Sequence, residues 1–458
     1  MITEVSQSMN KRYSMLFSVT AVAVLAATLF GSTYTNSQVV GSTLAASSHD
    51  NMSQTNDIGG LKLVMPQAYA AVDCDNIEPG RNVVSFDLYA RSVDLPVLGG
   101  KTYKAQTFSG QVPGPTLRVT QGDVVKMTLT VPADEMTPHG NDMHAAQMHP
   151  GSGMDAAQIG TSKTYCYVAQ VPGTFKYHCS GVNIAAMDQH VLSGMYGMTI
   201  VDPIKGYKPL IVEKTKLNDN GDVVIDKQRY SADALEFQLQ YAQLYLNDEG
   251  GYDQGKMFKH ETTYTVVNGM SFGYVPNANH NKLIKGDANK NIFVVQPWNS
   301  DDLKQYQSQL LFVEAGQHVR VFIENQANEP VYWHVVGEII DRVTQGNVVH
   351  AKGTETWMIG GSQGAIMDMV FDEPGVYAAV NHDYAAIFTG AATIFVAGDP
   401  FGLNEQLGTN AQSYSELLGN PSDAVPPTGK NTIEHPKLNL HGLYTDERAD
   451  ELKSELGL

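Results

Sequence analysis

The stretch from His178 to Met195, HCSGVNIAAMDQHVLSGM, decides how this chain is interpreted. It offers the Cys179 thiolate between two imidazoles, His178 and His190, with a thioether at Met195. Soft sulfur, imidazole and a weak methionine ligand make up the donor set of a blue-type copper that passes single electrons. The alternative is a buried free cysteine with unrelated neighbours. Because the chain has only three cysteines and this one stands among histidines, we predict a blue-type copper site.

A second group of histidines lies upstream, at His139 and His144. A blue-type copper needs another histidine from an upstream strand, and His139 fits that need. Because side chains alternate between the two faces of a strand, His178 must face away from any metal that Cys179 faces. His139 and His144 are an odd number of residues apart, so an extended segment would also aim them at opposite faces. The sequence therefore predicts two metal sites on opposite sides of one sheet, joined by the link between His178 and Cys179.

The chain also repeats itself. Residues 117–127, LRVTQGDVVKM, parallel residues 311–321, LFVEAGQHVRV, and the PGTF of 172–175 parallels the PGVY of 374–377. Both halves show alternating apolar and polar residues bounded by Gly and Pro, a pattern typical of strands. A spacing of about two hundred residues indicates domain duplication, since solenoid repeats recur every 20–50 residues or so. We predict an all-β fold of two tandem Greek-key β-sandwiches.

These motifs together resemble the copper-containing nitrite reductases, which are built from two cupredoxin domains. The pattern His139-x-x-Asp142-x-His144, followed by the His178-Cys179 pair, carries the resemblance, which covers roughly residues 80 to 400. One departure is the loop from Cys179 to His190, which is about two residues longer than in the best-known members. Gln189 also stands where those members have a Trp just before the second type 1 histidine.

The resemblance assigns the metal ligands and implies two coppers per chain. A type 1 electron-transfer copper would be bound by His139, Cys179, His190 and Met195. A type 2 catalytic copper would be bound by His144, His178 and His382. In the family, the third type 2 histidine comes from a neighbouring subunit, so the resemblance implies a homotrimer with the active site at a subunit interface.

The resemblance also implies the reaction. Nitrite would occupy the open position of the type 2 copper, and one electron with two protons would convert it into nitric oxide and water. Asp142 and His334 match catalytic positions and are the candidate proton donors, because an acid and an imidazole can both be tuned toward neutral pH. Val336 matches an apolar residue that crowds the bound ligand. The alternative for His334 is that it merely caps a strand.

Other functions make different demands on the sequence. A two-domain multicopper oxidase needs paired His-x-His motifs for a trinuclear cluster, and the chain has no His-x-His. A non-enzymatic electron-transfer cupredoxin needs only the first copper site, so it leaves Asp142, His334 and His382 unexplained. Action on another small nitrogen species, such as hydroxylamine, stays open. The extra histidine at His149 is interpreted as a surface loop residue.

The length of 458 residues allows two sizeable domains with additional segments. We predict a signal peptide or N-terminal anchor at 1–31, a flexible linker at 32–75, a first cupredoxin domain at 76–203 with the type 1 copper and two type 2 ligands, a second cupredoxin domain at 204–398 with the third type 2 ligand and the catalytic histidine, and a C-terminal extension at 399–458. The extension either embraces a neighbouring subunit, as the resemblance implies, or is a disordered tail.

The N-terminus indicates export. Lys11-Arg12 precede an apolar run from Met15 to Phe30, whose 16 residues fall short of the roughly 20 that span a bilayer. The run is therefore a cleaved signal peptide or an uncleaved membrane anchor of a periplasmic or otherwise extracytoplasmic protein. Outside the cytoplasm, Cys74 and Cys166 could form a disulfide. Both could also be free buried thiols, since spacing alone establishes no pair.

The net charge of −18 limits the partners. An acidic surface without a basic stripe repels the phosphate backbone, which excludes nucleic acid. The same charge favours a basic or weakly charged electron carrier, and we expect a small donor protein of the cupredoxin or cytochrome type. The resemblance implies that the loop from Cys179 to His190 is the docking face for that donor.

Overall fold

The computed structural model describes residues 72–97, 101–148, 153, 155–181, 184–271, 310–400 and 402–412, with four short strands outside these ranges. The predicted signal peptide or anchor, most of the predicted linker, His149 and the chain beyond residue 412 lie outside the described residues. Within the described residues, no helix is both long and apolar enough to span a bilayer. The predicted domain boundaries stay predictions, and both sandwiches lie in one compact unit, Pro66–Leu458.

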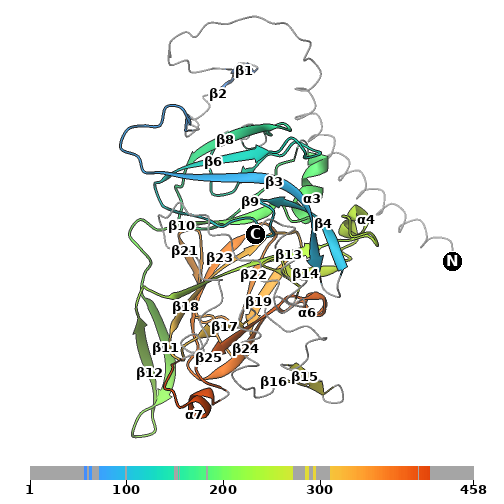
Figure 1. The fold of residues 1–458 in the computed structure, drawn as a ribbon. Coiled ribbons are helices and arrows are strands. Elements are labelled where there is room, and N and C mark those ends of the chain that lie inside the picture. Colours follow the sequence, from blue (N-terminus) through green and yellow to red (C-terminus); the bar gives the residue numbers. More distant parts are fainter. Residues whose placement is uncertain are drawn as a thin grey trace, which may run out of the picture. The chain divides into compact units, whose positions relative to one another are not determined.

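The first sandwich consists of two four-stranded sheets (Figure 1). One sheet has the order β4-β3-β6-β8, with β3 (Val83–Val97), β4 (Lys101–Phe108), β6 (Val124–Val131) and β8 (Thr161–Val168). The other has the order β5-β10-β9-β7, with β5 (Leu117–Thr120), β7 (Asp142–Met143), β9 (Gly173–His178) and β10 (Tyr196–Asp202). Helix α3 (Ile184–Leu192) lies in the connection from β9 to β10.

The second sandwich has a six-stranded and a five-stranded sheet. The first has the order β14-β13-β18-β23-β20-β21, with β13 (Leu235–Leu244), β14 (Tyr264–Val267), β18 (His318–Asn325), β20 (Arg342–Gln345), β21 (Val348–Ala351) and β23 (Gly364–Val370). The second has the order β17-β25-β24-β19-β22, with β17 (Leu310–Val313), β19 (Val331–Val335), β22 (Thr356–Ile359), β24 (Gly375–Asn381) and β25 (Ala392–Ala397).

The remaining elements are short. Hairpin β11–β12 (Leu210–Leu217 and Val223–Tyr230) follows the first sandwich. The helices α4 (Gln254–Phe258), α6 (Tyr384–Thr389) and α7 (Leu403–Leu407) belong to the second half of the chain. Two further antiparallel pairs are β1 (Asn56–Ile58) with β2 (Leu61–Leu63), and β15 (Ile284–Asp287) with β16 (Ile292–Val295).

The two sandwiches share a common core of strands, as the internal repeat predicts, and the second adds β20, β21 and β22. In the first, β3 runs parallel to β6 and β5 runs parallel to β10, while β9 and β10 are antiparallel. In the second, β13 runs parallel to β18 and β17 to β25, while β24 and β25 are antiparallel. The all-β fold of two cupredoxin-like sandwiches is therefore confirmed.

Burial patterns explain how each strand is used. In β6 the buried side chains Val125, Met127, Leu129 and Val131 alternate with half-buried ones, as expected of a strand with one face in the core. Strand β18 is instead buried along its whole length. Its inner face, including Val321, lies in the core of the second sandwich, whereas Phe322 packs with Met198 and Ile200 of β10. Apolar packing therefore joins the two sandwiches.

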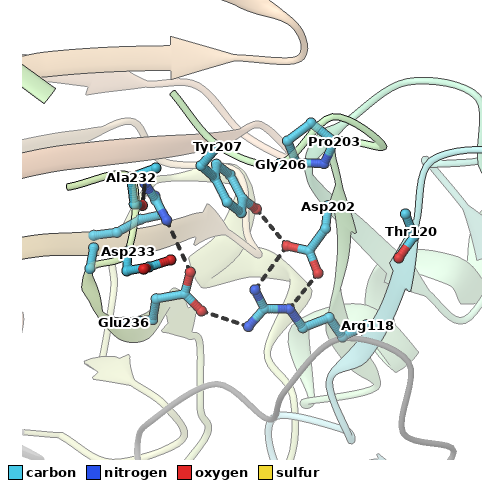
Figure 2. A pocket seen from close by; sticks show the side chains of 11 residues that line it. Arg118, Thr120, Asp202, Pro203, Gly206, Tyr207, Ala232, Asp233 and Glu236 are labelled. Carbon is cyan, nitrogen blue, oxygen red and sulfur yellow. Dashed lines mark hydrogen bonds and ion pairs between the residues drawn. The ribbon is translucent and has the colours of Figure 1, made fainter. Parts of the chain in front are cut away.

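A network of charges adds to this junction (Figure 2). The Arg118 guanidinium of β5 donates to both carboxylate oxygens of Asp202 at 2.7 and 2.8 Å, and to Glu236 of β13 at 2.7 Å. Arg320 of β18 donates to the other oxygen of Glu236 at 3.1 Å and lies 3.8 Å from the ring centroid of Tyr207. These residues line a cavity of about 460 Å³. Carboxylates neutralise both guanidiniums, and these ion pairs link the two sandwiches. Removing one charged side chain would leave the opposite charge buried without a partner.

A disulfide anchors the start of the first sandwich. Cys74 and Cys166 are joined, with their Cα atoms 5.5 Å apart, and Cys166 lies on β8. The disulfide alternative is thus confirmed over the pair of free thiols. Cys74 stands near the end of the predicted linker, so this part of the segment is tied to the sandwich. Cys179 is then the free cysteine of the chain, and it is buried.

Candidate metal centre

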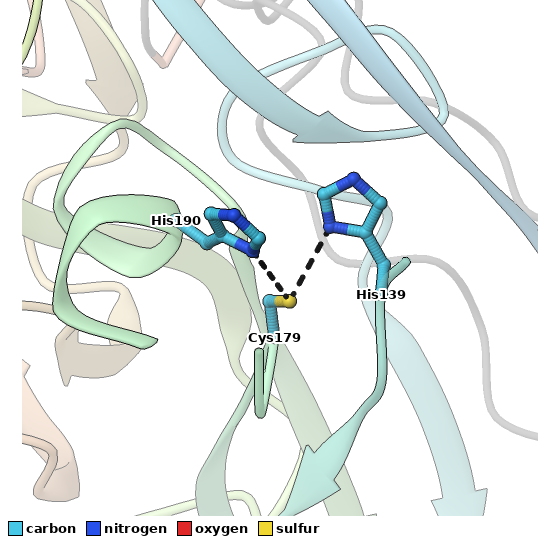
Figure 3. Close-up of side chains that lie close together, drawn as sticks. All are labelled: His139, Cys179 and His190. Carbon is cyan, nitrogen blue, oxygen red and sulfur yellow. Dashed lines mark hydrogen bonds between the residues drawn. The ribbon is translucent and has the colours of Figure 1, made fainter. Parts of the chain in front are cut away.

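The buried side chain of Cys179 faces two imidazoles (Figure 3). Its Sγ lies 3.5 Å from Nδ1 of His139 and 3.3 Å from Nδ1 of His190. The sulfur and both ring nitrogens lie within 4.8 Å of one another, the spacing of a group that could hold one metal ion. His139 comes from the chain before β7, and His190 from α3. The structure therefore brings together three of the four predicted type 1 ligands.

The two imidazoles are oriented with Nδ1 toward the sulfur. Nε2 of His139 lies 3.2 Å from Oγ1 of Thr137, so an Nε2–H can donate to that hydroxyl and leave the Nδ1 lone pair facing inward. Burial, with a smaller contribution from His190, lowers the pKa of His139 to about 3. Burial also lowers the pKa of His190. Both rings are therefore neutral at pH 7, which is the form that binds metals.

Backbone amides surround the sulfur. The N–H of Gly181 donates to Cys179 Sγ over 3.3 Å, and the backbone of Gly140 also hydrogen-bonds to the thiol. Burial nevertheless dominates and raises the pKa of Cys179 to about 11. Without a cation the group is thus a neutral thiol, and a bound metal would favour the thiolate.

Met195 is adjacent to these ligands through the backbone. Its carbonyl accepts from the N–H of Cys179 at 3.0 Å, and its own N–H donates to the carbonyl of His190 at 3.0 Å. Its side chain is fully buried in the same apolar cluster as Cys179. The predicted role of Met195 as a weak fourth ligand stays a prediction.

A second group forms on the other side of the sheet. Nε2 of His178 lies 3.1 Å from Nε2 of His144. The Asp142 carboxylate lies 3.6 Å from the first of these nitrogens and 3.9 Å from the second. The His178 side chain is 9% exposed, whereas that of Asp142 is 42% exposed, so the group opens to solvent on the Asp142 side. The structure therefore separates the donors into the two back-to-back groups that strand alternation predicts.

A hydrogen bond fixes the His178 ring. Its Nδ1 lies 2.9 Å from the carbonyl oxygen of Cys179, so Nδ1–H donates and Nε2 keeps its lone pair for a metal. Burial is the largest cause that lowers the pKa of His178 to about 3, and Lys176 adds to it. The carbonyl of Cys179 therefore orients the ligand of one group while its side chain belongs to the other.

His334 and His382 lie together on the second sandwich. Their ring centroids are 5.3 Å apart, His334 lying on β19 and His382 directly after β24. Nδ1 of His334 lies 2.7 Å from the carbonyl of Glu355, so Nδ1–H donates and Nε2 stays available. His334 is thus inside a strand and does not cap one. Among the described residues of one chain, the group formed by Asp142, His144 and His178 does not include His382.

Several residues that support the two groups were not predicted from the sequence. Lys176 lies two residues before His178, and the backbone of Ser362 hydrogen-bonds to the His144 imidazole. In the Cys179 group, the helix that carries His190 is held by the Tyr252 hydroxyl, which donates to Asp188 of α3 at 2.7 Å. Strand periodicity could have placed Lys176 on the His178 face. No sequence signal points to Ser362 or Tyr252, because both come from the distant second sandwich.

Comparisons with known proteins identify the family. A family model described as multicopper oxidase matches residues 90–206. The copper-containing nitrite reductase of Neisseria meningitidis serogroup A is 26% identical over 333 residues, covering 71% of this chain and 71% of the relative. That of Cereibacter sphaeroides is 30% identical over 304 residues, covering 65% of this chain and 71% of the relative. The solved copper nitrite reductase of Nitrosomonas europaea superposes with a TM-score of 0.53 at 28% identity, covering 69% of this chain and 95% of that one.

The chain belongs to the copper-containing nitrite reductase family.

Membership of the copper-containing nitrite reductases makes the chain a copper oxidoreductase, which agrees with the donors in the structure. One buried thiol between two neutral imidazoles suits a soft, borderline metal such as copper. Two further imidazoles turn their Nε2 atoms toward each other beside a carboxylate, and a third histidine would complete a three-histidine site. Both groups therefore fit the metal that the family name implies.

The buried thiol gives a pH prediction for the metal-free protein. Because burial raises the pKa of Cys179 to about 11, the thiol is protonated below that pH and alkylation should be slow. Its rate with iodoacetamide should rise about tenfold per pH unit from pH 8 toward pH 11, whereas the unfolded chain should level off near pH 8.5. Mass spectrometry of the labelled protein measures both rates. A native profile that levels off near pH 8.5 would contradict the burial argument.

Proposed function

We propose that this protein reduces nitrite by one electron to nitric oxide and water, and that it binds two coppers per chain. The observation that carries the proposal is the pair of donor groups on either side of the His178–Cys179 peptide link. In a bound state, copper would supply electron transfer at the Cys179 group and Lewis-acid binding of nitrite at the His144–His178 group. The reaction consumes nitrite, one electron and two protons, and it releases one nitric oxide and one water.

The chain's own side chains would deliver the protons. Asp142 places a carboxylate beside the two facing imidazole nitrogens and is open to solvent, so it can hold a proton next to a bound anion. His334 donates Nδ1–H to the Glu355 carbonyl, which fixes the ring and leaves Nε2 for proton exchange. We propose Asp142 and His334 as the two proton donors.

The part of the type 2 site that holds His334 and His382 would come from another copy of the chain. Large apolar side chains are exposed around His334 and His382, namely Tyr332, Val336, Met358, Tyr384 and Phe388, and they range from 39% to 77% exposed. An apolar patch of this kind rimmed by polar groups marks an interface. We propose a homotrimer in which this patch covers the Asp142 group of a neighbouring subunit and His382 becomes the third ligand of its type 2 copper.

The electron would enter near α3. His190 lies on α3, and Asp188 of the same helix is fixed by Tyr252 and by Gln254, whose amide donates at 3.1 Å. A rigid ligand-bearing helix suits the docking of a small cupredoxin or cytochrome donor. The disulfide favours an oxidising compartment, so we propose that the protein works outside the cytoplasm, either free or held by its N-terminal segment.

A multicopper oxidase is the second candidate, because the matching family model carries that description. Its trinuclear cluster would require paired His-x-His motifs, and the sequence contains none. The oxidase is therefore less well supported than the nitrite reductase. Copper analysis separates the two.

Copper content tests the two-site scheme. We expect two coppers per wild-type chain, with distinct EPR hyperfine patterns. Cys179→Ser should lose the type 1 signal and one copper, while His178→Ala should lose the type 2 signal and keep the type 1 colour. His260→Ala, at an exposed position, is the control and should retain both. One copper per wild-type chain would favour an electron shuttle, and four would favour the oxidase.

Asp142→Asn tests the proton donor. The variant keeps the size and polarity of the side chain but removes the acid, so nitric oxide production should fall about a hundredfold or more. The type 1 colour should not change, because Asp142 lies on the opposite side of the sheet. Asp134→Asn, an exposed aspartate of the same sandwich, is the matched control. Unaltered turnover in Asp142→Asn would remove Asp142 from the mechanism.

Mixed trimers test the shared active site. His178→Ala and His382→Ala should each be inactive alone, because each lacks one half of the type 2 site. Trimers reassembled from equal amounts of both chains should recover about a quarter of wild-type turnover, the share of interfaces at which two intact halves meet. Nitric oxide release from the co-refolded mixture measures the recovery. If the mixture stays inactive while remaining trimeric, each site is built within one chain.

A further inference from the structure

Lys176 is a buried cation on the same strand face as His178. The two residues are two positions apart in β9, so their side chains leave the same side of the sheet. Lys176 is 3% exposed. Its Nζ donates to the carbonyl of Gln326 at 2.6 Å and to Oγ of Ser362 at 3.1 Å, both in the second sandwich. The second sandwich therefore holds the ammonium in one place.

The ammonium lies within electrostatic reach of the type 2 group. Alternate residues of a strand lie roughly 7 Å apart along it, so Lys176 and His178 are neighbours on one face of β9. The Lys176 carbonyl also accepts the backbone N–H of His144 at 2.9 Å. Ser362 contacts both residues, because its hydroxyl accepts from Lys176 and its backbone hydrogen-bonds to the His144 ring. Charge and ligands thus belong to one connected arrangement.

One buried acid of β18 acts on this cation without forming an ion pair with it among the described residues. Glu324 is fully buried, and neither of its carboxyl oxygens has a hydrogen-bond partner within the described parts of the chain. Burial raises the pKa of Glu324 well above its usual value, which favours the neutral acid. The Lys176 Nζ instead donates to two neutral acceptors, the Gln326 carbonyl and the Ser362 hydroxyl. Hydrogen bonds to neutral groups hold the ammonium in place without cancelling its charge.

We propose that Lys176 is a positioning residue whose buried positive charge raises the reduction potential of the type 2 copper and the affinity of that copper for anionic nitrite. The inference rests on the proposed function. A bound copper would change in charge from +2 to +1 on receiving the electron that the carrier supplies through the Cys179 group. A neighbouring cation repels the lower charge less, so it favours the reduced state, and the effect is strong where water is excluded. The same cation attracts an anion to the site.

A purely structural role makes a different prediction. If Lys176 only tied the sandwiches together through Gln326 and Ser362, its replacement would reduce stability but leave the potential of the type 2 copper unchanged. The potential is therefore the deciding readout, and it can be measured without nitrite turnover.

The experiment compares charge with hydrogen bonding. Lys176→Gln keeps a donor and removes the charge, Lys176→Arg keeps the charge, and Ser362→Ala removes one hydrogen-bond acceptor only. Lys216→Gln removes one charge from exposed β11 as a matched control. Redox titration of the trimer followed by EPR gives the type 2 potential, with the type 1 copper as internal standard. Azide titration of the oxidised protein gives the anion affinity.

We expect the equilibrium for reducing the type 2 copper to shift about tenfold toward the oxidised state in Lys176→Gln, equal to about 59 mV for one electron. Azide should bind several-fold more weakly. Lys176→Arg, Ser362→Ala and Lys216→Gln should stay close to wild type. If Lys176→Gln does not fold, Lys176→Met, which keeps the aliphatic length, replaces it.

Three results would overturn the inference. The type 2 potential could be unchanged in the folded charge-free variant, or Ser362→Ala could shift it equally. Glu324→Gln could raise the potential as much as Lys176→Gln lowers it, which would mean that the pair is neutral. Failure of the proposed function looks different, because wild-type protein would then bind no type 2 copper or make no nitric oxide from nitrite.

Discussion

The end of β9 is held by strands on both sides, and this pairing determines the whole centre. His178 is paired with Asp142 of β7 and with Tyr196 of β10, and the N–H of Cys179 continues the ladder to the Met195 carbonyl. The backbone therefore stays extended across the peptide link, and consecutive side chains must leave opposite faces. A shift of one residue in register would exchange the thiol and the imidazole between the two groups.

Burial and fixed hydrogen bonds prepare both groups for a metal. Imidazoles whose pKa values lie far below neutral carry free lone pairs, and the hydroxyl of Thr137 and the carbonyl of Cys179 decide which nitrogen presents them. The first group is closed to water, whereas the second opens at Asp142. This difference matches what each would do, since electron transfer benefits from a closed site and substrate binding needs access.

The fold and most of the site could be predicted from sequence because they depend on local rules. Alternation within strands separates Cys179 from His178, and the internal repeat gives two sandwiches with a common core of strands. The pairing of Cys74 with Cys166 could not be predicted, since spacing does not define partners. Nor could the contacts of Ser362, because a loop of the second sandwich reaches the His144 ring only once both domains have packed. The metal-ligand roles, including that of Met195, and the trimer remain predictions.

The disulfide affects the redox state of the Cys179 thiol in the metal-free protein. Disulfide formation at Cys179 would need a second sulfur, and Cys74 and Cys166 are already bonded to each other on the sheet that contains β8. Cys179, on the opposite sheet, is left with no intramolecular partner, and its burial shields it from other thiols. In the metal-free protein, the thiol of Cys179 is therefore protected from disulfide exchange, and the sulfur that we propose as a copper ligand stays reduced.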